Sequence, residues 1–412
     1  MDEYNKKHIL VLTSTYQISQ SGDIPGFVNR LCERISPNYK ITVLTQHSGD
    51  EELIENIKGI EVHRFQYAPR RFELLSGHGG MLASIKRRPT TFVLIPIFVF
   101  AQVAAIRKLC KSIKPDIIHA HWIVPQGLAA LLARKASKQK PPIVLTSHGG
   151  DLYGLSGALF GIIKKFVLNN VDCICVVSKS MKEYVRDVLG IDSKTVNVLP
   201  MGSELSDKFV PDHNRSRDRG TLLFVGRLVE KKGVSDLIRA FCLAKQKAPD
   251  LTLKIVGDGP DLLELKSLAR NLELDETIEF VGSVSHDILP KYYQTAEAAV
   301  FPFVKATDGD MEGLGLVVVE AMGCETPVIV GDVPAIQDTV IDNKTGVIFR
   351  SGNYQDLAEK IIQMHSDPAL RNRLGKNSRI YAQERFSWDV CADRYLKLFQ
   401  EVLSNDQSIS TR

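Results

Sequence analysis

Two glutamates in the second half of the chain have the types and spacing for binding chemistry. Glu312 and Glu320 lie in the segment Asp308–Glu320, which follows a predicted strand at 298–302. The two glutamates are eight residues apart. At about 1.5 Å of helical rise per residue they cannot contact the same ligand atoms, but they can bind two parts of one extended ligand. A helix is predicted to start between them. Its first backbone N–H groups, which can bind phosphate, are those of Gly313, Leu314, Gly315 and Leu316. Glu320 would then face a sugar hydroxyl. The alternative is a plain helix with an acidic first turn.

Two cations leave another predicted strand at 221–226. Arg227 and Lys232 follow Gly226 in a strand-to-helix loop, a suitable place for neutralising a diphosphate leaving group. A solvated basic turn is the alternative. A related loop around Gly257 carries only a partial glycine pattern, because position 262 is leucine. The missing glycine weighs against a dinucleotide-binding dehydrogenase.

Histidines close two predicted strands of the first half. His119 and His121 point to one face of a strand at 116–121, and His148 and Asp151 follow the strand at 142–148. These four side chains could form a metal cluster. We expect instead that His119 and His121 pack with hydrogen bonds inside the sheet. His148 is expected to contact a ligand, because the adjacent glycines open space on the loop side of its strand.

Short apolar runs alternate with helical patterns through most of the sequence, which indicates an α/β protein with parallel strands. Further strands are predicted at 8–15, 41–46, 61–65, 172–178, 195–199, 251–257, 277–281, 327–330 and 346–349. A polar segment at 203–220 is interpreted as an interdomain linker. We therefore predict two tandem doubly wound domains, 1–205 and 206–386, facing across a cleft that holds the site. The segment 387–412 is predicted to form a C-terminal helix and tail that packs back on the first domain.

The composition is that of an ordinary globular protein. The 412 residues include 52 basic and 48 acidic side chains with 44% hydrophobic residues, which excludes disorder. Seven cysteines without a disulfide or metal-clip pattern indicate a reducing compartment. No export signal is visible at the N-terminus. A cytoplasmic protein is expected, with no nucleic-acid partner.

The basic residues are distributed unevenly. Residues 1–205 hold 26 basic and 17 acidic side chains, and between Arg64 and Lys114 ten cations face the single acid Glu73. Within this stretch, the apolar segment 92–106 is shorter than the roughly 20 residues that a spanning helix needs, so we expect a core helix there. The one-sided charge instead predicts peripheral binding to anionic lipid on the inner face of the cell membrane. The residues assigned to that patch are Arg70, Arg71, Lys86, Arg87 and Arg88.

Together the motifs resemble glycosyltransferase family 4, retaining enzymes of the GT-B fold. The resemblance covers nearly the whole chain. It rests on the Glu-x7-Glu pair 312/320, the loop Gly226–Gly233, and the segments Val256–Pro260, Phe280–Gly282, Ala321–Pro327 and His148–Asp151.

The resemblance implies a nucleotide-sugar donor held mainly by the second domain. Arg227 and Lys232 would bind its diphosphate, Glu320 its ribose and Glu312 its sugar. Backbone groups near Gly282 would approach the base, and His148 would reach the sugar from the other domain. The resemblance also implies no essential metal or other cofactor, and retention through same-face attack assisted by the leaving phosphate.

The sequence departs from the family pattern in the loop after the first strand. Many members carry a Gly-Gly pair there, whereas this chain has Gly22 and Asp23 before Pro25. Such a loop still provides a tight turn and an open helix start. Gly22, Asp23 and Asp151 are assigned to the acceptor side.

The sequence thus predicts a retaining transferase that moves a hexose from a UDP- or GDP-sugar to a lipid-linked or saccharide acceptor, in polysaccharide or glycolipid synthesis. One alternative is a nucleotide-sugar epimerase or hydrolase of the same fold, which would turn over donor without acceptor. The other is a regulator that binds nucleotide sugar without turnover. Its expected mark is a broken Glu-x7-Glu pair or a missing Arg227 or Lys232.

Overall fold

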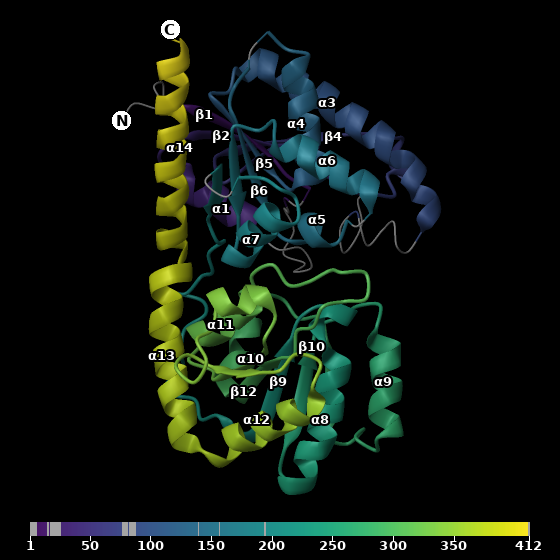
Figure 1. Cartoon of the computed structure of the whole chain (residues 1–412), viewed down its shortest axis with the longest axis vertical. Coiled ribbons are helices and arrows are strands. Elements are labelled where there is room, and N and C mark those ends of the chain that lie inside the picture. The colour runs from purple at the N-terminus through teal and green to yellow at the C-terminus, as the bar shows by residue number, and fades with distance from the viewer. Residues whose placement is uncertain are drawn as a thin grey trace. The chain divides into compact units, whose positions relative to one another are not determined.

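The chain folds into two compact units, each with its own sheet (Figure 1). The computed structural model describes residues 6–14, 16, 26–75, 81, 88–138, 140–155, 157–192 and 195–410. Unit 1 comprises Met1–Val177, Met181–Leu199 and Cys391–Arg412. Unit 2 comprises Ser178–Ser180 and Pro200–Val390.

The described part of unit 1 contains an eight-stranded sheet in the order β3-β4-β2-β1-β5-β6-β7-β8. All neighbouring strands are parallel except β3 and β4. Every residue of β1, β5, β6 and β7 is buried, as expected for a parallel sheet covered on both faces. The strands are β1 (His8–Leu12), β2 (Lys40–Gln46), β3 (Ile54–Ile57), β4 (Ile60–Phe65), β5 (Ile117–His121), β6 (Ile143–Ser147), β7 (Cys173–Val176) and β8 (Val196–Val198).

Helices cover both faces of this sheet. Figure 1 shows α3, α4 and α6 over one face and α1 and α14 over the other. The connections that contain α3, α4 and α6 join β4 to β5, β5 to β6 and β6 to β7, and all three run in the same direction through the strand order. Because such connections are right-handed, the three helices lie on one face of the sheet. The helical elements are α1 (Phe27–Ile35), η2 (Arg70–Phe72), η3 (Pro89–Val93), α3 (Leu94–Ile113), η4 (Ile123–Gly127), α4 (Leu128–Lys135), α5 (Gly150–Tyr153), α6 (Ala158–Leu168), α7 (Lys179–Asp187) and α14 (Trp388–Ser410).

Unit 2 contains a six-stranded sheet that is parallel throughout its described residues, in the order β11-β10-β9-β12-β13-β14. Its strands are β9 (Asp218–Val225), β10 (Thr252–Val256), β11 (Ile278–Gly282), β12 (Ala296–Phe301), β13 (Val328–Gly331) and β14 (Val347–Phe349). Its helical elements are η6 (Glu230–Lys232), α8 (Val234–Lys247), α9 (Leu262–Asn271), α10 (Leu289–Thr295), α11 (Leu316–Gly323), η7 (Pro334–Asp338), α12 (Tyr354–Ser366) and α13 (Pro368–Phe386).

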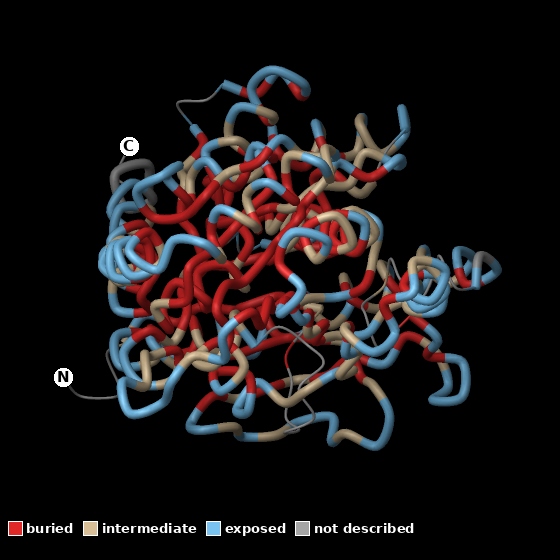
Figure 2. Tube along the Cα trace, turned by 90° about the horizontal axis from the view of Figure 1, so that it is seen from below, coloured by how far each residue is buried: buried red, intermediate tan, exposed pale blue. Residues whose placement is uncertain are grey.

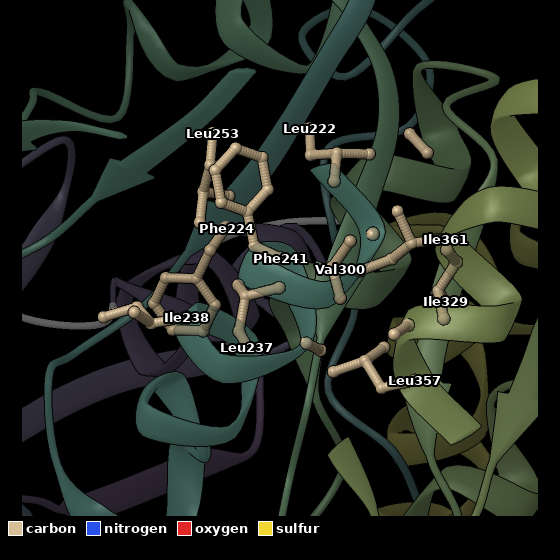
Figure 3. Packing of buried hydrophobic residues seen from close by; sticks show 14 of the residues in the cluster. Leu222, Phe224, Leu237, Ile238, Phe241, Leu253, Val300, Ile329, Leu357 and Ile361 are labelled. Carbon is tan, nitrogen blue, oxygen red and sulfur yellow. The ribbon is translucent and has the colours of Figure 1, made fainter. Parts of the chain in front are cut away.

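The core of unit 2 lies between this sheet and the adjacent helices α8 and α12. Figure 3 shows Phe224 of β9 and Val300 of β12 together with Leu237 and Phe241 of α8, and Leu357 of α12 nearby. All five side chains are completely buried. Figure 2 colours the Cα trace by burial, with buried segments in red and exposed segments in pale blue. This packing holds the strand ends, and hence the loops that leave them, in fixed positions.

The predicted α/β fold is confirmed, and each strand predicted from an apolar run is present. The prediction missed β3, whose four residues have no buried member and include Glu55 and Asn56. A polar strand at the edge of a sheet lacks the apolar run on which the prediction depended.

The polar segment 203–220 is part of unit 2, and its interpretation as a linker was wrong. The unit boundary lies between Leu199 and Pro200. Arg217 donates to the carbonyl oxygens of Tyr293, Ala296 and Cys324 at 2.8–3.0 Å, and Phe209 is fully buried. The several N–H donors of one guanidinium group can hold a segment without regular secondary structure against the rest of the unit. The pattern of apolar residues in the sequence does not reveal such a contact.

The C-terminal helix returns to unit 1, as predicted. From Cys391 onward α14 belongs to that unit. The ring centroid of Phe399 lies 5.9 Å from that of Tyr39 and 5.3 Å from that of His119. The Tyr395 hydroxyl donates to the carbonyl oxygen of Leu199 at 3.4 Å. Tyr395 and Phe399 are both fully buried, one helical turn apart.

The apolar segment 92–106 is not the core helix that we expected. Among the described residues, one helical stretch, Thr90–Ile113, is long and apolar enough to cross a bilayer. An 18-residue window within it has a mean hydropathy of 1.9, and only 22% of that window is buried. Five side chains of α3 are buried, among them Phe98, Ile106 and Leu109. The opposite side, which includes Phe100, is exposed. A hydropathy pattern measures how apolar a segment is, but it does not say what covers the segment.

Phe399→Ala should destabilise the chain by about 3–5 kcal/mol, because a fully buried phenylalanine loses its transfer free energy and leaves a cavity. Urea denaturation followed by circular dichroism measures this loss. Leu263→Ala on α9, where the side chain is 81% exposed, is the matched control and should change stability by less than about 0.5 kcal/mol. Equal stability of the two variants would mean that α14 does not stabilise unit 1.

Candidate functional site

The loops that leave the strands of unit 2 meet at the carboxyl edge of its sheet, because the strands are parallel. Gly226, after β9, donates its N–H to Val256 O at 3.0 Å, and Gly257, after β10, donates to Gly282 O at 2.8 Å. Leu228 donates to Asp258 O at 2.9 Å. Backbone bonds therefore join the loops after β9, β10 and β11, which are three of the four loops in which the sequence placed donor-binding residues.

Glycine is required where these loops touch. A Cβ at Gly257 would lie 1.9 Å from Gly226 O, and one at Gly233 would lie 1.8 Å from Pro302 O. Both glycines also have positive φ, 138° and 66°. Gly282 has φ 81° with nothing within 4 Å of a Cβ position, so its conformation rather than its surroundings favours glycine. The glycine pattern thus serves close backbone packing in two loops and a left-handed turn in the third.

Lys232 and Glu312 form an ion pair, with 2.6 Å between Nζ and Oε2. The lysine Nζ also lies 4.7 Å from the ring centroid of Phe303, and Glu312 Oε1 accepts from the N–H of Gly315 at 3.2 Å. The two side chains are only 12% and 15% exposed. Burial alone would raise the pKa of Glu312, but Lys232 and then Lys231 outweigh it and lower the pKa to about 2. A largely buried carboxylate that is ionised at neutral pH therefore stands directly beside a lysine.

The ion pair lies beside the start of α11. Gly315 has φ 81° and precedes the first helical residue, Leu316, and the first turn of the helix contains no acidic residue. The N-terminus of a helix presents unpaired N–H groups and a positive dipole end, which favour an anion. Gly313, Leu314, Gly315 and Leu316 are thus brought to the same place as Lys232 and Glu312.

Glu320 lies further along α11 and is held by residues that the sequence analysis did not identify. It is 8% exposed, and its two oxygens contact His286 Nε2 at 3.2 Å and Tyr293 Oη at 3.3 Å. Burial raises the pKa of Tyr293 well above its ordinary value, so the phenol stays protonated and donates to the carboxylate. His286 follows a strand, the same signal that identified His148, whereas Tyr293 sits in a helix and its sequence gives no such signal.

Two other acids near the ion pair are already engaged. Asp310 pairs with Lys231 at 3.0 Å, and Asp308 accepts from the N–H of Asp310 at 3.0 Å. Within the described part of the chain, no group of three or more His, Cys, Asp or Glu side chains could hold a metal ion. Arg227 is exposed on the same loop as Lys232.

In unit 1, His148 stands at the carboxyl end of β6 among aromatic rings. Its Nε2 lies 2.9 Å from His121 Nδ1, and its ring centroid lies 4.7 Å from Phe27 and 5.1 Å from Trp122. Burial, with a smaller effect of His119, lowers the pKa of His148 to about 3, so the imidazole is neutral at physiological pH. A neutral ring can donate or accept one hydrogen bond at each nitrogen, according to its tautomer.

The remaining first-half predictions have mixed outcomes. His119 Nε2 bonds Thr146 Oγ1 at 2.9 Å inside the sheet, as expected for a packing role. Asp151 is 3% exposed and accepts from Ile123 N at 2.6 Å, Ser147 Oγ at 2.8 Å and His148 N at 3.3 Å. Its carboxylate therefore fixes the loop that carries His148, and its acceptor-side role stays a prediction. Gly22 and Asp23 lie outside the described residues.

Comparison with known proteins assigns the family. Residues 206–381 match the family described as Glycosyl transferases group 1, and residues 27–207 match the one described as Glycosyltransferase Family 4. The chain belongs to glycosyltransferase family 4. As a member it is a glycosyltransferase, and the predicted family is confirmed.

Relatives and solved structures agree. An uncharacterized glycosyltransferase of Methanocaldococcus jannaschii is 28% identical over 357 residues, 85% of this chain and 93% of the relative. A GDP-mannose-dependent alpha-(1-6)-phosphatidylinositol monomannoside mannosyltransferase of Mycolicibacterium smegmatis is 27% identical, covering 76% and 83%. The structure of sucrose-phosphate synthase from Thermosynechococcus elongatus matches with a TM-score of 0.80 at 23% identity, over 97% of this chain and 100% of that one. The structure of Anabaena HepE in complex with UDP matches with a TM-score of 0.72 at 18% identity, over 96% of this chain and 100% of that one. These structures confirm the GT-B fold of the family 4 chain.

The ion pair of this glycosyltransferase predicts an acid-sensitive contribution to stability. The folded pKa of Glu312, about 2, lies below its ordinary 4.5, so the stabilisation is complete above about pH 4.5 and is lost as pH falls towards 2. In Glu312→Gln this contribution is absent. The difference in melting temperature between wild type and Glu312→Gln should therefore be largest near pH 6 and shrink steadily below pH 4.5. A difference that stays constant between pH 6 and pH 3 would contradict the depressed pKa.

Proposed function

We propose that the chain is a retaining glycosyltransferase that moves a hexose from a UDP- or GDP-sugar to a lipid-linked or saccharide acceptor in polysaccharide or glycolipid synthesis. The observation that carries the proposal is the Lys232–Glu312 pair beside the N-terminus of α11. This arrangement combines a cation and helix amides for a diphosphate with a carboxylate for a sugar.

Charge stabilisation on the leaving diphosphate is the main task in this mechanism. Breaking the bond between the sugar C1 and the β-phosphate oxygen leaves both bonding electrons on that oxygen. Lys232, Arg227 and the amides of 313–316 are proposed to bind the developing charge. Lys232 has three donors, so it can keep its bond to Glu312 while donating to phosphate.

The other binding roles follow the family pattern. Glu312 is proposed to accept hydrogen bonds from sugar hydroxyls, since its depressed pKa keeps it an acceptor at any physiological pH. Glu320 is proposed to bind the ribose, with Tyr293 and His286 fixing its rotamer. The left-handed backbone at Gly282 is proposed to approach the base, and His148 to hydrogen-bond the sugar.

Retention requires the acceptor oxygen to bond C1 on the face that the phosphate leaves. We propose that the acceptor hydroxyl gives its proton to the departing phosphate oxygen while its oxygen bonds C1, so no side chain needs to serve as base. Sugar configuration, protons and charge then balance without a covalent enzyme intermediate. Product analysis by NMR, which reports the anomeric configuration, tests this step.

The relatives support this donor class without fixing the base. The mycobacterial relative is named for GDP-mannose and a phosphatidylinositol mannoside acceptor, whereas HepE was solved with UDP and with UDP-glucose. We therefore propose a nucleoside-diphosphate hexose as donor. From the cysteine content and the basic stretch of the sequence, we also propose that the enzyme is cytoplasmic and lies on the inner face of the membrane. Thermal shift with UDP- and GDP-sugars separates the two bases, because a ligand of the folded state raises its melting temperature.

Alanine substitution in the site should lower activity without unfolding the chain. Lys232→Ala, Arg227→Ala and Glu312→Ala should each lower kcat/KM by at least about tenfold, on the order of 1.4 kcal/mol, because each removes a group that binds the transition state. Glu320→Ala should mainly raise the donor KM. Lys247→Ala, at an exposed position near the end of α8, is the matched control. Near wild-type turnover by any of the three would remove that residue from the site.

Chelation with EDTA should leave the rate unchanged. Three acids could bind a divalent ion near the diphosphate site: Glu312 and Asp310 are paired with Lys232 and Lys231, and Asp308 accepts from the N–H of Asp310. Two lysines and the helix amides can therefore take the role that a metal has in other transferases. Loss of activity that magnesium or manganese restores would overturn this part of the proposal.

A further inference from the structure

The outer face of unit 1 carries an unusual distribution of side chains. We define the acid-free face as the exposed residues of η3 with α3, of α4 and of α6. None of these elements contains Asp or Glu in its described sequence. The next helix along the chain, α7, contains Glu183 and Asp187, so the absence of acids is a property of this face and not of every helix in the unit.

On α3 the exposed residues form a stripe that changes character along the helix. Val93 and Phe100 are 73% and 74% exposed, and Ile97 lies between them on the same side. Ala104 and the cations Arg107 and Lys111 are exposed as well and follow Phe100 at spacings of three or four residues, so they lie on the same side of the helix. A shallow surface hollow at this end is lined by Ala104, Arg107, Lys108, Lys111 and Ser112.

The two neighbouring helices repeat this gradient. On α6, Leu159 and Ile162 are 64% and 66% exposed, and the exposed Lys165 follows them. On α4, which packs against both α3 and α6, Leu132 is exposed and Lys135 follows. All three helices begin at the carboxyl edge of the sheet, so on each of them the exposed apolar residues lie nearer that edge than the exposed cations. We call these two parts of the face its apolar half and its cationic half.

The single acid of the basic stretch does not reach this surface. Glu73 is buried with its carboxylate 2.6 Å from His47 Nδ1. Arg64, one of the ten cations, is buried as well and lies 3.0 Å from Glu51 and 3.3 Å from Glu55. The surface formed by the rest of the described stretch is therefore cationic without a local counter-charge from that stretch.

Simpler explanations account for only part of the pattern. Favourable interaction with the helix dipole explains cations towards the C-terminal ends of the helices but not the exposed phenylalanine, isoleucine and leucine that precede them. Exposed apolar residues also occur singly on ordinary surfaces, but here they recur on three adjacent helices and each time precede an exposed cation. A membrane-spanning α3 would have to leave α4 and the rings of Phe65 and Tyr67, which Phe98 contacts at 5.1 and 5.0 Å.

We propose that the acid-free face binds the surface of an anionic lipid bilayer, with the apolar halves of its helices entering the acyl boundary and the cations contacting phosphate headgroups. The inference deepens the proposed membrane-side function and rests on it. It also moves the contact from the predicted patch: Arg70, Arg71 and Arg88 are exposed and can add to the attraction, and Lys86 and Arg87 lie outside the described residues. The complementary charge and the apolar end together select a bilayer over a purely polar partner.

Vesicle sedimentation of the full chain tests the proposal, with phosphatidylcholine vesicles compared to vesicles that also contain phosphatidylglycerol. Wild type should sediment with the anionic vesicles at low salt. The apolar variant Val93→Gln/Ile97→Gln/Phe100→Gln and the charge variant Arg107→Glu/Lys108→Glu/Lys111→Glu should each bind at least about tenfold more weakly. The matched controls should bind like wild type: Val188→Gln/Leu263→Gln/Ile380→Gln and Lys247→Glu/Lys266→Glu/Lys376→Glu, all at exposed positions elsewhere.

A fluorescent probe distinguishes insertion from surface attraction. In Phe100→Trp, emission should shift to the blue on anionic vesicles and be quenched by brominated acyl chains, after subtraction of the wild-type signal from Trp122 and Trp388. No shift and no quenching would overturn insertion. Wild type that stays in the supernatant, or variants that bind as wild type does, would overturn the proposal and leave the face to a protein partner.

Failure of this proposal is separable from failure of the proposed function. None of the substituted residues belongs to the proposed donor site, so donor turnover without vesicles should be unchanged in every variant. Loss of vesicle binding with intact turnover supports the face as a membrane contact. Absence of any transfer in wild type, with vesicle binding intact, would instead contradict the catalytic assignment.

Discussion

Close backbone contact at the carboxyl edge of the six-stranded sheet is the constraint on which the donor side of this chain depends. At Gly233, Gly257, Gly259 and Gly331 an added Cβ would lie 1.8, 1.9, 2.1 and 2.5 Å from a carbonyl oxygen of a neighbouring loop. No other residue fits such a contact without moving the backbone. Lys232 directly precedes the first of these glycines, so its position is set by the packing of two strand-end loops. The site can therefore be rigid although its residues lie on loops.

Electrostatics at the site follows from this rigidity. Burial by itself would raise the pKa of the Glu312 carboxyl group. The nearby charges of Lys232 and Lys231 outweigh this effect and lower the pKa. The same lysine is the proposed ligand of the diphosphate, so one cation keeps the carboxylate charged before the donor arrives and shares its donors afterwards. Removing the lysine would thus leave a buried charge unpaired as well as a phosphate unbound, which costs more than either loss alone. A double-mutant cycle on the pair is the appropriate way to separate the two effects.

The sequence predicted the parts of the structure that depend on periodic apolar runs and on glycine spacing. The parallel strands and the return of α14 follow from such patterns, and so does the convergence of the loops that carry Lys232 and Glu312, because strand ends of a parallel sheet meet at one edge. The ion pair between these two side chains was not among the predictions. The sequence did not reveal what depends on burial of polar groups or on tertiary cover. Arg217 fastens a segment that looked like a linker, Arg64 and Glu73 turn inward from a stretch that looked uniformly exposed, and α3 keeps an apolar side that looked like core. Each of these depends on a partner distant in sequence, which local composition does not specify.

The topology of unit 1 joins its two functional proposals. His148 follows β6 at the carboxyl edge of the eight-stranded sheet, and α3, α4 and α6 all begin at that same edge. The apolar half of the acid-free face therefore lies at the end of the unit that also presents His148, while the cationic half extends away along the helices. With the apolar half in the acyl boundary, the carboxyl edge would be held near the headgroups, where the reactive hydroxyl of a lipid-linked acceptor is found. A soluble acceptor would gain nothing from this arrangement, so the gradient on the three helices favours the lipid-linked class among the acceptors that the fold allows.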